Sequence, residues 1–108
     1  MLRTEPLEEG VGLRLFGELA DVNVGLAAAA FDRLAEIGGD ITLDLSGVTF
    51  MDSMGLGKLI VLAIGLTDRG HLWLLNVRPQ LMRVFELVSP RRPLPNMTVE
   101  PIAEAAAR

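Results

Sequence analysis

The amino-acid sequence predicts an α/β domain with a mixed, mostly parallel β-sheet of four to five strands and about four α-helices. Strand-like and helix-like segments alternate along the chain, and this order implies crossover connections between parallel strands. Only a short turn separates the first two strand-like segments, so we expect that pair to be antiparallel. With 108 residues, the chain is long enough for one compact domain and too short for two, which predicts a single domain over residues 1–108.

Five segments are candidates for the strands of this sheet. Apolar residues alternate with other residues from Val11 to Phe16, which is typical of a half-buried strand. The strongest candidates are ITLDL at residues 41–45 and HLWLLN at residues 71–76. Two shorter candidates lie near the ends of the chain, at residues 2–7 and 97–99. The first of these short segments is expected at an edge of the sheet.

The first two helices are indicated by capping residues and glycine stops. Asp21 can cap the first helix, and the glycine pair at residues 38–39 can end it. The second helix is expected over residues 53–68, with Gly70 as its stop. In the first helix, apolar residues recur at helical spacing, namely Leu26, Ala30, Leu34 and Ile37.

The third helix is expected to begin at Pro79, because the first turn of a helix does not need the N–H that proline lacks. Three apolar residues of this segment share one helical face: Leu81, Phe85 and Val88. Prolines at positions 90, 93 and 95 exclude regular structure over residues 90–95. A short fourth helix is expected over residues 101–107.

The composition excludes several classes of function. The absence of cysteine rules out disulfides, thiolate metal sites and a cysteine nucleophile, and it fits a cytoplasmic protein. A net charge of −4 argues against a general nucleic-acid binder, because no basic field neutralises phosphates. The longest apolar stretch, residues 59–66, is far shorter than the roughly 20 residues of a membrane span. His71 is the single histidine, so we expect no metal, no cofactor and no histidine-based catalysis.

The stretch FMDSMGLG, residues 50–57, contains more polar and small residues than a helix start requires. One capping side chain is sufficient, and either Asp52 or Ser53 could supply it. Gly55 and Gly57 follow in the first turn, although glycine is a poor helix former. This surplus makes the stretch the candidate functional site.

The residues of this stretch suit a serine that accepts a phosphoryl group. Free backbone N–H groups and the helix dipole favour negative charge at the position of Ser53. Gly55 and Gly57 would let the active site of another protein approach closely, and Asp52 could orient the hydroxyl or accept its proton. Ordinary capping, with glycines that let the helix pack closely on the sheet, explains the same residues and is the simpler interpretation. The residues alone leave both interpretations open.

The run ITLDLSGVTFMDSMGLGKLIVL resembles the central signature of the STAS domains, and in particular that of the anti-sigma-factor antagonists. In that family, a V-x-L-D-L strand precedes F-[ILM]-D-S-[STA]-G-L, which here correspond to residues 41–45 and 50–56. The similarity covers residues 10–90. The chain departs from the pattern at Met54, where the family has Ser, Thr or Ala, and at residues 17–21, where GELAD replaces G-E-L-D.

The resemblance implies a binding protein without enzymatic activity. Family members bind an anti-sigma factor that is also a serine kinase, and this releases a sigma factor for transcription. The kinase phosphorylates the first serine of the signature, here Ser53, the complex dissociates, and a metal-dependent serine phosphatase restores the active form. We expect a monomer or weak dimer whose partner-binding surface comprises Glu18, Asp21, Asp52, Ser53, Met54, Gly55, Gly57 and Lys58.

The resemblance also permits a second function, in which the domain is a structural subunit of a lipid-transport ABC system or of a stress-signalling assembly. Ser53 would then be only a helix cap, and the apolar helix from Gly55 to Leu66 would be a permanent interface. That helix is apolar nearly all round, with Lys58 as its main exception. Either a partner or a neighbouring helix would cover residues such as Val61, Leu62 and Gly65.

Overall fold

The computed structural model describes residues 2–20, 22–66, 70–88 and 94–103, except for the side chain of Val88. Strands and helices alternate over this part of the chain, as the sequence predicts. In chain order the elements are β1 (Leu2–Pro6), β2 (Gly12–Leu19), α1 (Asn23–Ile37), β3 (Ile41–Met51), α2 (Ser53–Leu66), β4 (Leu72–Val77), α3 (Pro79–Val88) and β5 (Met97–Pro101).

The five strands form one sheet in the order β1-β2-β3-β4-β5. β1 and β2 pair antiparallel, and the other neighbouring strands pair parallel, which confirms the predicted mixed, mostly parallel sheet. The described residues contain three helices. The expected fourth helix does not begin at Pro101, because Pro101 ends β5, and most of that segment lies outside the described residues.

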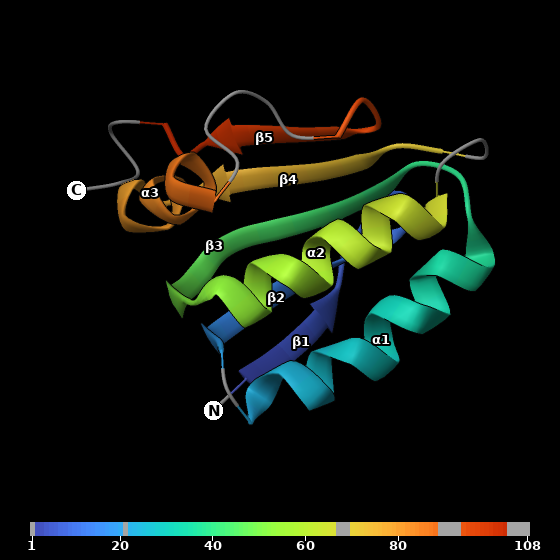
Figure 1. Cartoon of the computed structure of the whole chain (residues 1–108). Helices are drawn as coiled ribbons and strands as arrows, with labels where there is room; N and C mark the ends of the chain where they lie inside the picture. Colours follow the sequence, from blue (N-terminus) through green and yellow to red (C-terminus); the bar gives the residue numbers. More distant parts are fainter. Residues whose placement is uncertain (1, 21, 67–69, 89–93, 104–108) are drawn as a thin grey trace.

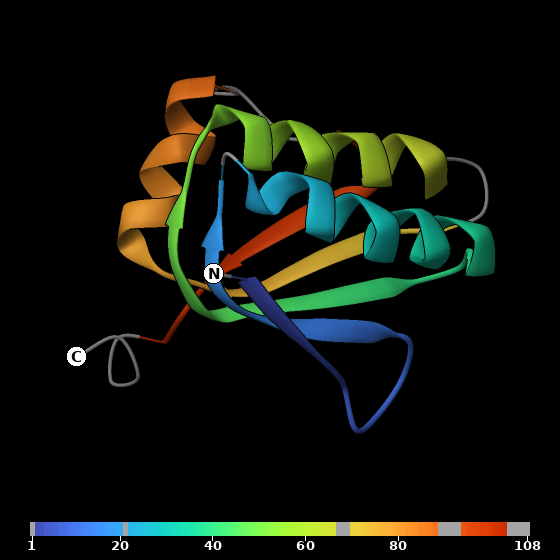
Figure 2. The same ribbon diagram turned by 90° about the horizontal axis from the view of Figure 1, so that it is seen from below.

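The three helices lie on one face of the sheet (Figures 1 and 2). Each of them connects two neighbouring parallel strands, and successive connections move across the sheet in the same direction. Because such crossovers are almost always right-handed, they bring all the helices to the same side. α1 and α2 run side by side over the sheet, and α3 lies at the end where β3 finishes (Figure 2).

The core is formed between this sheet and the helices. The strands contribute buried leucines at alternate positions, such as Leu43, Leu45 and Leu74, because successive strand residues point to opposite faces. α2 contributes Leu56, Leu59, Leu62, Ala63 and Leu66. Complete burial of a leucine stabilises the fold by about 1.5–3 kcal/mol. The apolar layer between the sheet and the helices is therefore the main source of stability.

Bulges between β2 and β3 place the start of α2. The pairing register shifts between Arg14 and Phe16 and again between Gly17 and Glu18. Such irregularities bend and twist a strand pair, and the carboxyl ends of β2 and β3 curve toward the helices (Figure 2). At this curved end of the sheet, Asp52 is the single residue between the end of β3 and the first residue of α2.

β3 is longer than its sequence suggests. The ITLDL segment was expected to end at Leu45, but the strand continues to Met51. Ser46 and Gly47 look locally like the beginning of a loop. Instead, Gly47 is the position at which β3 passes under a neighbouring side chain: a Cβ there would lie 2.5 Å from Phe16 Cδ1.

The buried face of α1 differs from the face that the apolar spacing indicates. The structure buries Val24, Ala27, Phe31 and Leu34, whereas Leu26 and Ile37 are about 60% exposed. Both sets recur at helical spacing, so the choice between them depends on tertiary packing. Asp21, the expected cap, lies outside the described residues, and the helix ends at Gly38 as predicted, with a φ of 73°.

The remaining expectations are largely confirmed. α3 begins at Pro79 and buries Leu81 and Phe85. β4 begins at Leu72, one residue later than expected, and β5 extends to Pro101. Residues 67–68 of the expected second helix lie outside the described residues.

Candidate functional site

The start of α2 carries the serine that the signature singles out. Ser53 is the first residue of α2 and is exposed. Immediately before it, Asp52 acts as the helix cap: the Gly55 N–H donates a hydrogen bond to Asp52 Oδ1 at 2.9 Å. The Leu56 N–H donates to the Asp52 carbonyl oxygen at 3.0 Å and so forms the first helical turn. Of the two possible caps, the structure uses Asp52.

Because Asp52 caps the helix, the Ser53 side chain is not needed for capping. Within the described part of the chain, its hydroxyl forms no hydrogen bond. The N-terminal turn of α2 nevertheless surrounds it with backbone N–H groups that favour an anion. The position therefore suits a negatively charged modification. Proton acceptance by Asp52, one of whose oxygens caps the helix, stays a prediction.

The two glycines of the first turn have different surroundings. Gly55 is buried, and a Cβ at this position would overlap the backbone carbonyl of Leu19 at the end of β2. The expectation that Gly55 opens the site to another protein is therefore wrong, since its missing side chain makes room for the chain's own backbone. Gly57 differs, because a Cβ there would meet no atom within 4 Å. Close approach of a partner at Gly57 stays a prediction.

Exposed apolar side chains flank Ser53. Met54 is 59% exposed, as expected of a contact residue, whereas Met51 is 1% exposed and fills the core. Phe50 is 53% exposed, and sequence reasoning did not include it in the contact surface. Strand alternation could have identified it, because Phe50 must point away from the core if its neighbour Met51 points in.

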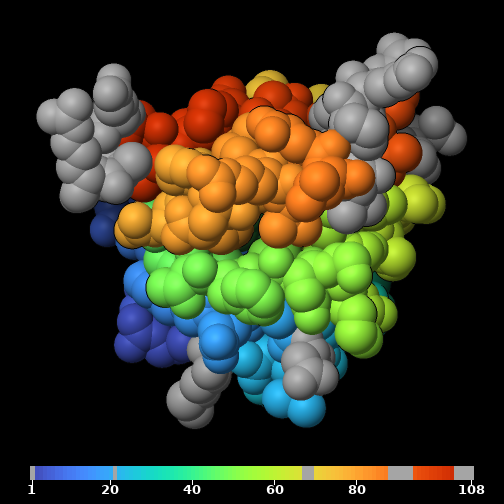
Figure 3. Space-filling view, turned by 60° about the vertical axis from the view of Figure 1, so that its left-hand side comes forward, coloured from blue at the N-terminus to red at the C-terminus, as the bar shows by residue number. Residues whose placement is uncertain are grey.

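The other expected contact residues differ in how close they lie to the start of α2. Glu18 is exposed and pairs in register with Phe50, so it lies at the same edge as the serine. Lys58 is half-buried, more than one turn farther along α2. Asp21 lies outside the described residues. Figure 3 shows this end of the molecule, where the start of α2 lies between α3 and the adjoining parts of β2 and α1.

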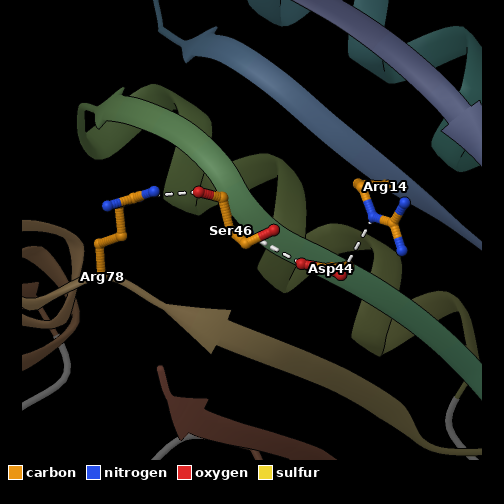
Figure 4. Close-up of polar contacts among 4 residues, drawn as sticks. All are labelled: Arg14, Asp44, Ser46 and Arg78. Atoms are coloured by element: carbon orange, nitrogen blue, oxygen red, sulfur yellow. Dashed lines mark hydrogen bonds and ion pairs between the residues drawn. The ribbon is translucent and has the colours of Figure 1, made fainter. Parts of the chain in front are cut away.

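A second polar cluster lies on β3, around Asp44 (Figure 4). Arg14 Nε donates to Asp44 Oδ2 at 3.2 Å, and the Ser46 N–H donates to Asp44 Oδ1 at 2.9 Å. Arg78 Nε donates to the Ser46 carbonyl oxygen at 2.7 Å. Burial would raise the pKa of Asp44, but hydrogen bonds from Ser46, Asn76 and Arg14 outweigh it and hold the pKa below its usual value. These contacts join β2, β3 and the β4–α3 connection, so the cluster has a structural role.

The described residues contain no group of three or more His, Asp or Glu side chains that could hold a metal ion. Nor does any described helix combine the length and the apolar character that crossing a membrane requires. His71 instead contacts the Thr98 hydroxyl, with 2.6 Å between Nε2 and Oγ1, and packs against Trp73.

Comparisons with known proteins agree with this architecture. An anti-sigma factor antagonist from Mycobacterium paratuberculosis superposes with a TM-score of 0.77 and 20% sequence identity, covering 98% of this chain and 91% of that chain. The unphosphorylated form of the anti-sigma factor antagonist SpoIIAA superposes with a TM-score of 0.64 and 22% identity, covering 98% and 92%. At such identities the similarity shows the fold alone.

No curated protein is significantly similar to the chain in sequence. The family comparison is decisive, because the STAS domain matches residues 4–92, which include most of β1, the strands β2 to β4 and the three described helices. The resemblance seen in the signature is thereby confirmed. The chain belongs to the STAS domain family.

Proposed function

We propose that this protein is a cytoplasmic anti-sigma-factor antagonist. It binds an anti-sigma factor with serine kinase activity and thereby releases a sigma factor. Phosphorylation of Ser53 by that kinase ends the interaction, and a serine phosphatase reverses it. The fold shared with two anti-sigma factor antagonists supports this proposal, although a fold by itself does not determine a function.

The observation that carries the proposal is that the helix cap and the proposed phosphorylation site at the start of α2 are different residues. Asp52 caps the helix through its bond to the Gly55 N–H, while Ser53 is exposed and is not needed for that task. A serine that only capped the helix would accept that bond itself. An exposed hydroxyl at a helix N-terminus can instead enter a kinase active site and can carry a phosphate without unfolding the helix.

The charge of the phosphate explains why modification would end binding. Phosphorylation adds about −1.5 to −2 charges beside Asp52 in a chain whose net charge is already −4. At an interface with an effective dielectric constant near 20, a phosphate charge and a carboxylate of the partner about 4 Å apart would repel by roughly 4 kcal/mol. A loss of about 3 kcal/mol weakens binding more than a hundredfold. One phosphate is therefore sufficient to switch the complex off.

One observation favours the alternative function as a structural subunit. Val61 and Ile64 of α2 are 56% and 52% exposed, and a permanent partner would cover such residues. This alternative does not require a modified Ser53, so the two functions differ in their response to charge at that position.

The test compares three variants as baits in lysate from the native host, with bound proteins identified by mass spectrometry. We expect Ser53→Ala to retain a protein with a kinase-type ATP-binding domain and Ser53→Asp to lose it. Thr4→Asp is the matched control, because it adds the same charge at an exposed position on β1, and it should bind like the wild type.

A second measurement identifies the acceptor directly. The captured kinase, with ATP, should phosphorylate the wild-type chain at Ser53 and leave Ser53→Ala unmodified. Retention of the same partner by Ser53→Ala and Ser53→Asp would contradict the phosphoswitch and support the structural-subunit function.

A further inference from the structure

The groove between α1 and α2 is a second surface, which shares only Lys58 with the contact surface expected for the kinase. It has a volume of about 160 Å³ and is lined mainly by apolar and small residues. From α1 these are Ala28, Phe31, Asp32 and Ala35, and from α2 they are Lys58, Val61, Leu62 and Gly65. Together with the exposed Ile64, these residues define what we call the α1–α2 face.

The α2 side of this face is unusually apolar for a helix surface. Lys58 is the single charged residue among the 14 residues of α2. Val61 and Ile64 are more than half exposed, and Gly65 is exposed beside them. Three positions so close in sequence present a continuous apolar strip, because residues three and four apart lie on one side of a helix. A surface helix usually carries polar residues there.

Opposite charges stand on the two walls of the groove. Asp32 lies on the α1 wall and Lys58 on the α2 wall, and no described residue forms an ion pair with either side chain. α1 and α2 run in the same direction, because each connects a strand to the next parallel strand (Figure 2). The face therefore has a negative side and a positive side along two parallel helices.

We propose that a second copy of this chain binds the α1–α2 face and forms a symmetric dimer. A twofold axis parallel to the helices would place α1 of each copy over α2 of the other. Asp32 of each copy would then face the wall that carries Lys58 of the other, so both charges gain a partner at once. Such an arrangement is self-complementary, as a twofold interface requires. The apolar strips around Val61 would be buried between them.

The size of the face predicts a weak dimer. α2 contains 14 residues and is therefore about 20 Å long. Two helices of that length, with axes about 10 Å apart, cover roughly 400 Å² per copy. A standard stable interface buries about 800 Å² per partner. Association should accordingly appear only at high protein concentrations.

The dimer is compatible with the proposed switch at Ser53 but does not depend on it. Ser53 precedes Lys58 by five residues, which is about 7.5 Å along the helix axis. The exposed hydroxyl lies at the end of α2, beyond the groove. Dimerisation is a property of the purified chain alone and needs no kinase. Failure of one proposal therefore leaves the other intact.

Charge reversals test the dimer, with sedimentation equilibrium at about 10 µM to about 1 mM, the range in which small interfaces associate. We expect the wild type to dimerise in this range. Lys58→Glu and Asp32→Lys should each raise the dissociation constant about tenfold or more, because two attractive pairs become repulsive. An equimolar mixture of these two variants should form a heterodimer, detectable by native mass spectrometry, since every pair again joins opposite charges.

The matched controls are Arg33→Glu and Glu36→Lys, which make charge changes of the same size at exposed positions of α1 outside the groove. They should dimerise like the wild type, whereas Val61→Asp should be monomeric. A wild-type chain that stays monomeric up to about 1 mM would overturn the proposal. An unchanged dissociation constant in each of the single variants Lys58→Glu and Asp32→Lys would also overturn it. So would the absence of a heterodimer in the equimolar mixture of these two variants.

Discussion

Alanine at Gly55 should destabilise the fold, although alanine is the better helix former. The Cβ of Gly55→Ala would overlap the Leu19 carbonyl, a backbone atom held in place by the pairing of Leu19 with Met51. The start of α2 must then move away from β2, which loosens the packing of Leu56 beneath it. Overpacking typically costs about 1–3 kcal/mol and more where the obstacle is rigid. The gain in helix propensity offsets only about 1 kcal/mol of this.

We therefore expect Gly55→Ala to lower the free energy of unfolding by about 2 kcal/mol and the Tm by about 10 °C. Urea denaturation and thermal unfolding followed by circular dichroism measure both quantities. Gly57→Ala is the matched control in the same helix, where a Cβ meets no atom within 4 Å. This control should be more stable than the wild type by about 0.5–1 kcal/mol. Shifts of the same sign in the two variants would refute the assignment of Gly55 to close packing.

Three further predictions concern the cap, the Asp44 cluster and α1. Asp52→Ala should lose about 1 kcal/mol of stability by urea denaturation, and Ser53→Ala should stay within about 0.5 kcal/mol of the wild type. Because the pKa of Asp44 is lower in the folded chain, its stabilisation is present above the unfolded pKa near 3.8 and is lost as the pH falls through the folded pKa. Asp44→Asn should therefore flatten the acid limb of the stability–pH curve, and an unchanged limb would contradict the network. Phe31→Ala should cost about 3–5 kcal/mol and Leu26→Ala less than about 0.5 kcal/mol, so equal losses would contradict the observed burial.

Local sequence was sufficient to predict most of the fold. Alternating apolar residues, prolines and glycine stops act within a few residues of one another, so strands and helices could be placed without a structure. Gly38, for example, ends α1 with a positive φ as a glycine stop predicts. The antiparallel pairing of β1 with β2 followed from the short turn between them.

Errors arose where two local patterns compete or where a distant residue decides. α1 has apolar residues on two faces, and the face that meets the sheet is Ala27 and Phe31 rather than Leu26. Gly47 resembles a turn residue, yet it lies inside β3. Glycine is needed at this position because Phe16 of the neighbouring strand occupies the space that a side chain would fill. Neither choice can be read from residues close in sequence.

The sequence by itself determined that this chain is an α/β domain with a serine at the start of an apolar helix, and its signature resembles that of the STAS family. These features depend on periodicity and on a contiguous motif. Only the tertiary structure decided that Asp52 caps α2 while Ser53 is exposed. It also decided that position 55 has no room for a side chain, because the backbone carbonyl of Leu19 occupies that space. The reason is physical, because the capping geometry and the close contact of α2 with the backbone of β2 depend on how β2, β3 and α2 pack together. That packing is determined by residues more than 30 positions apart in the chain.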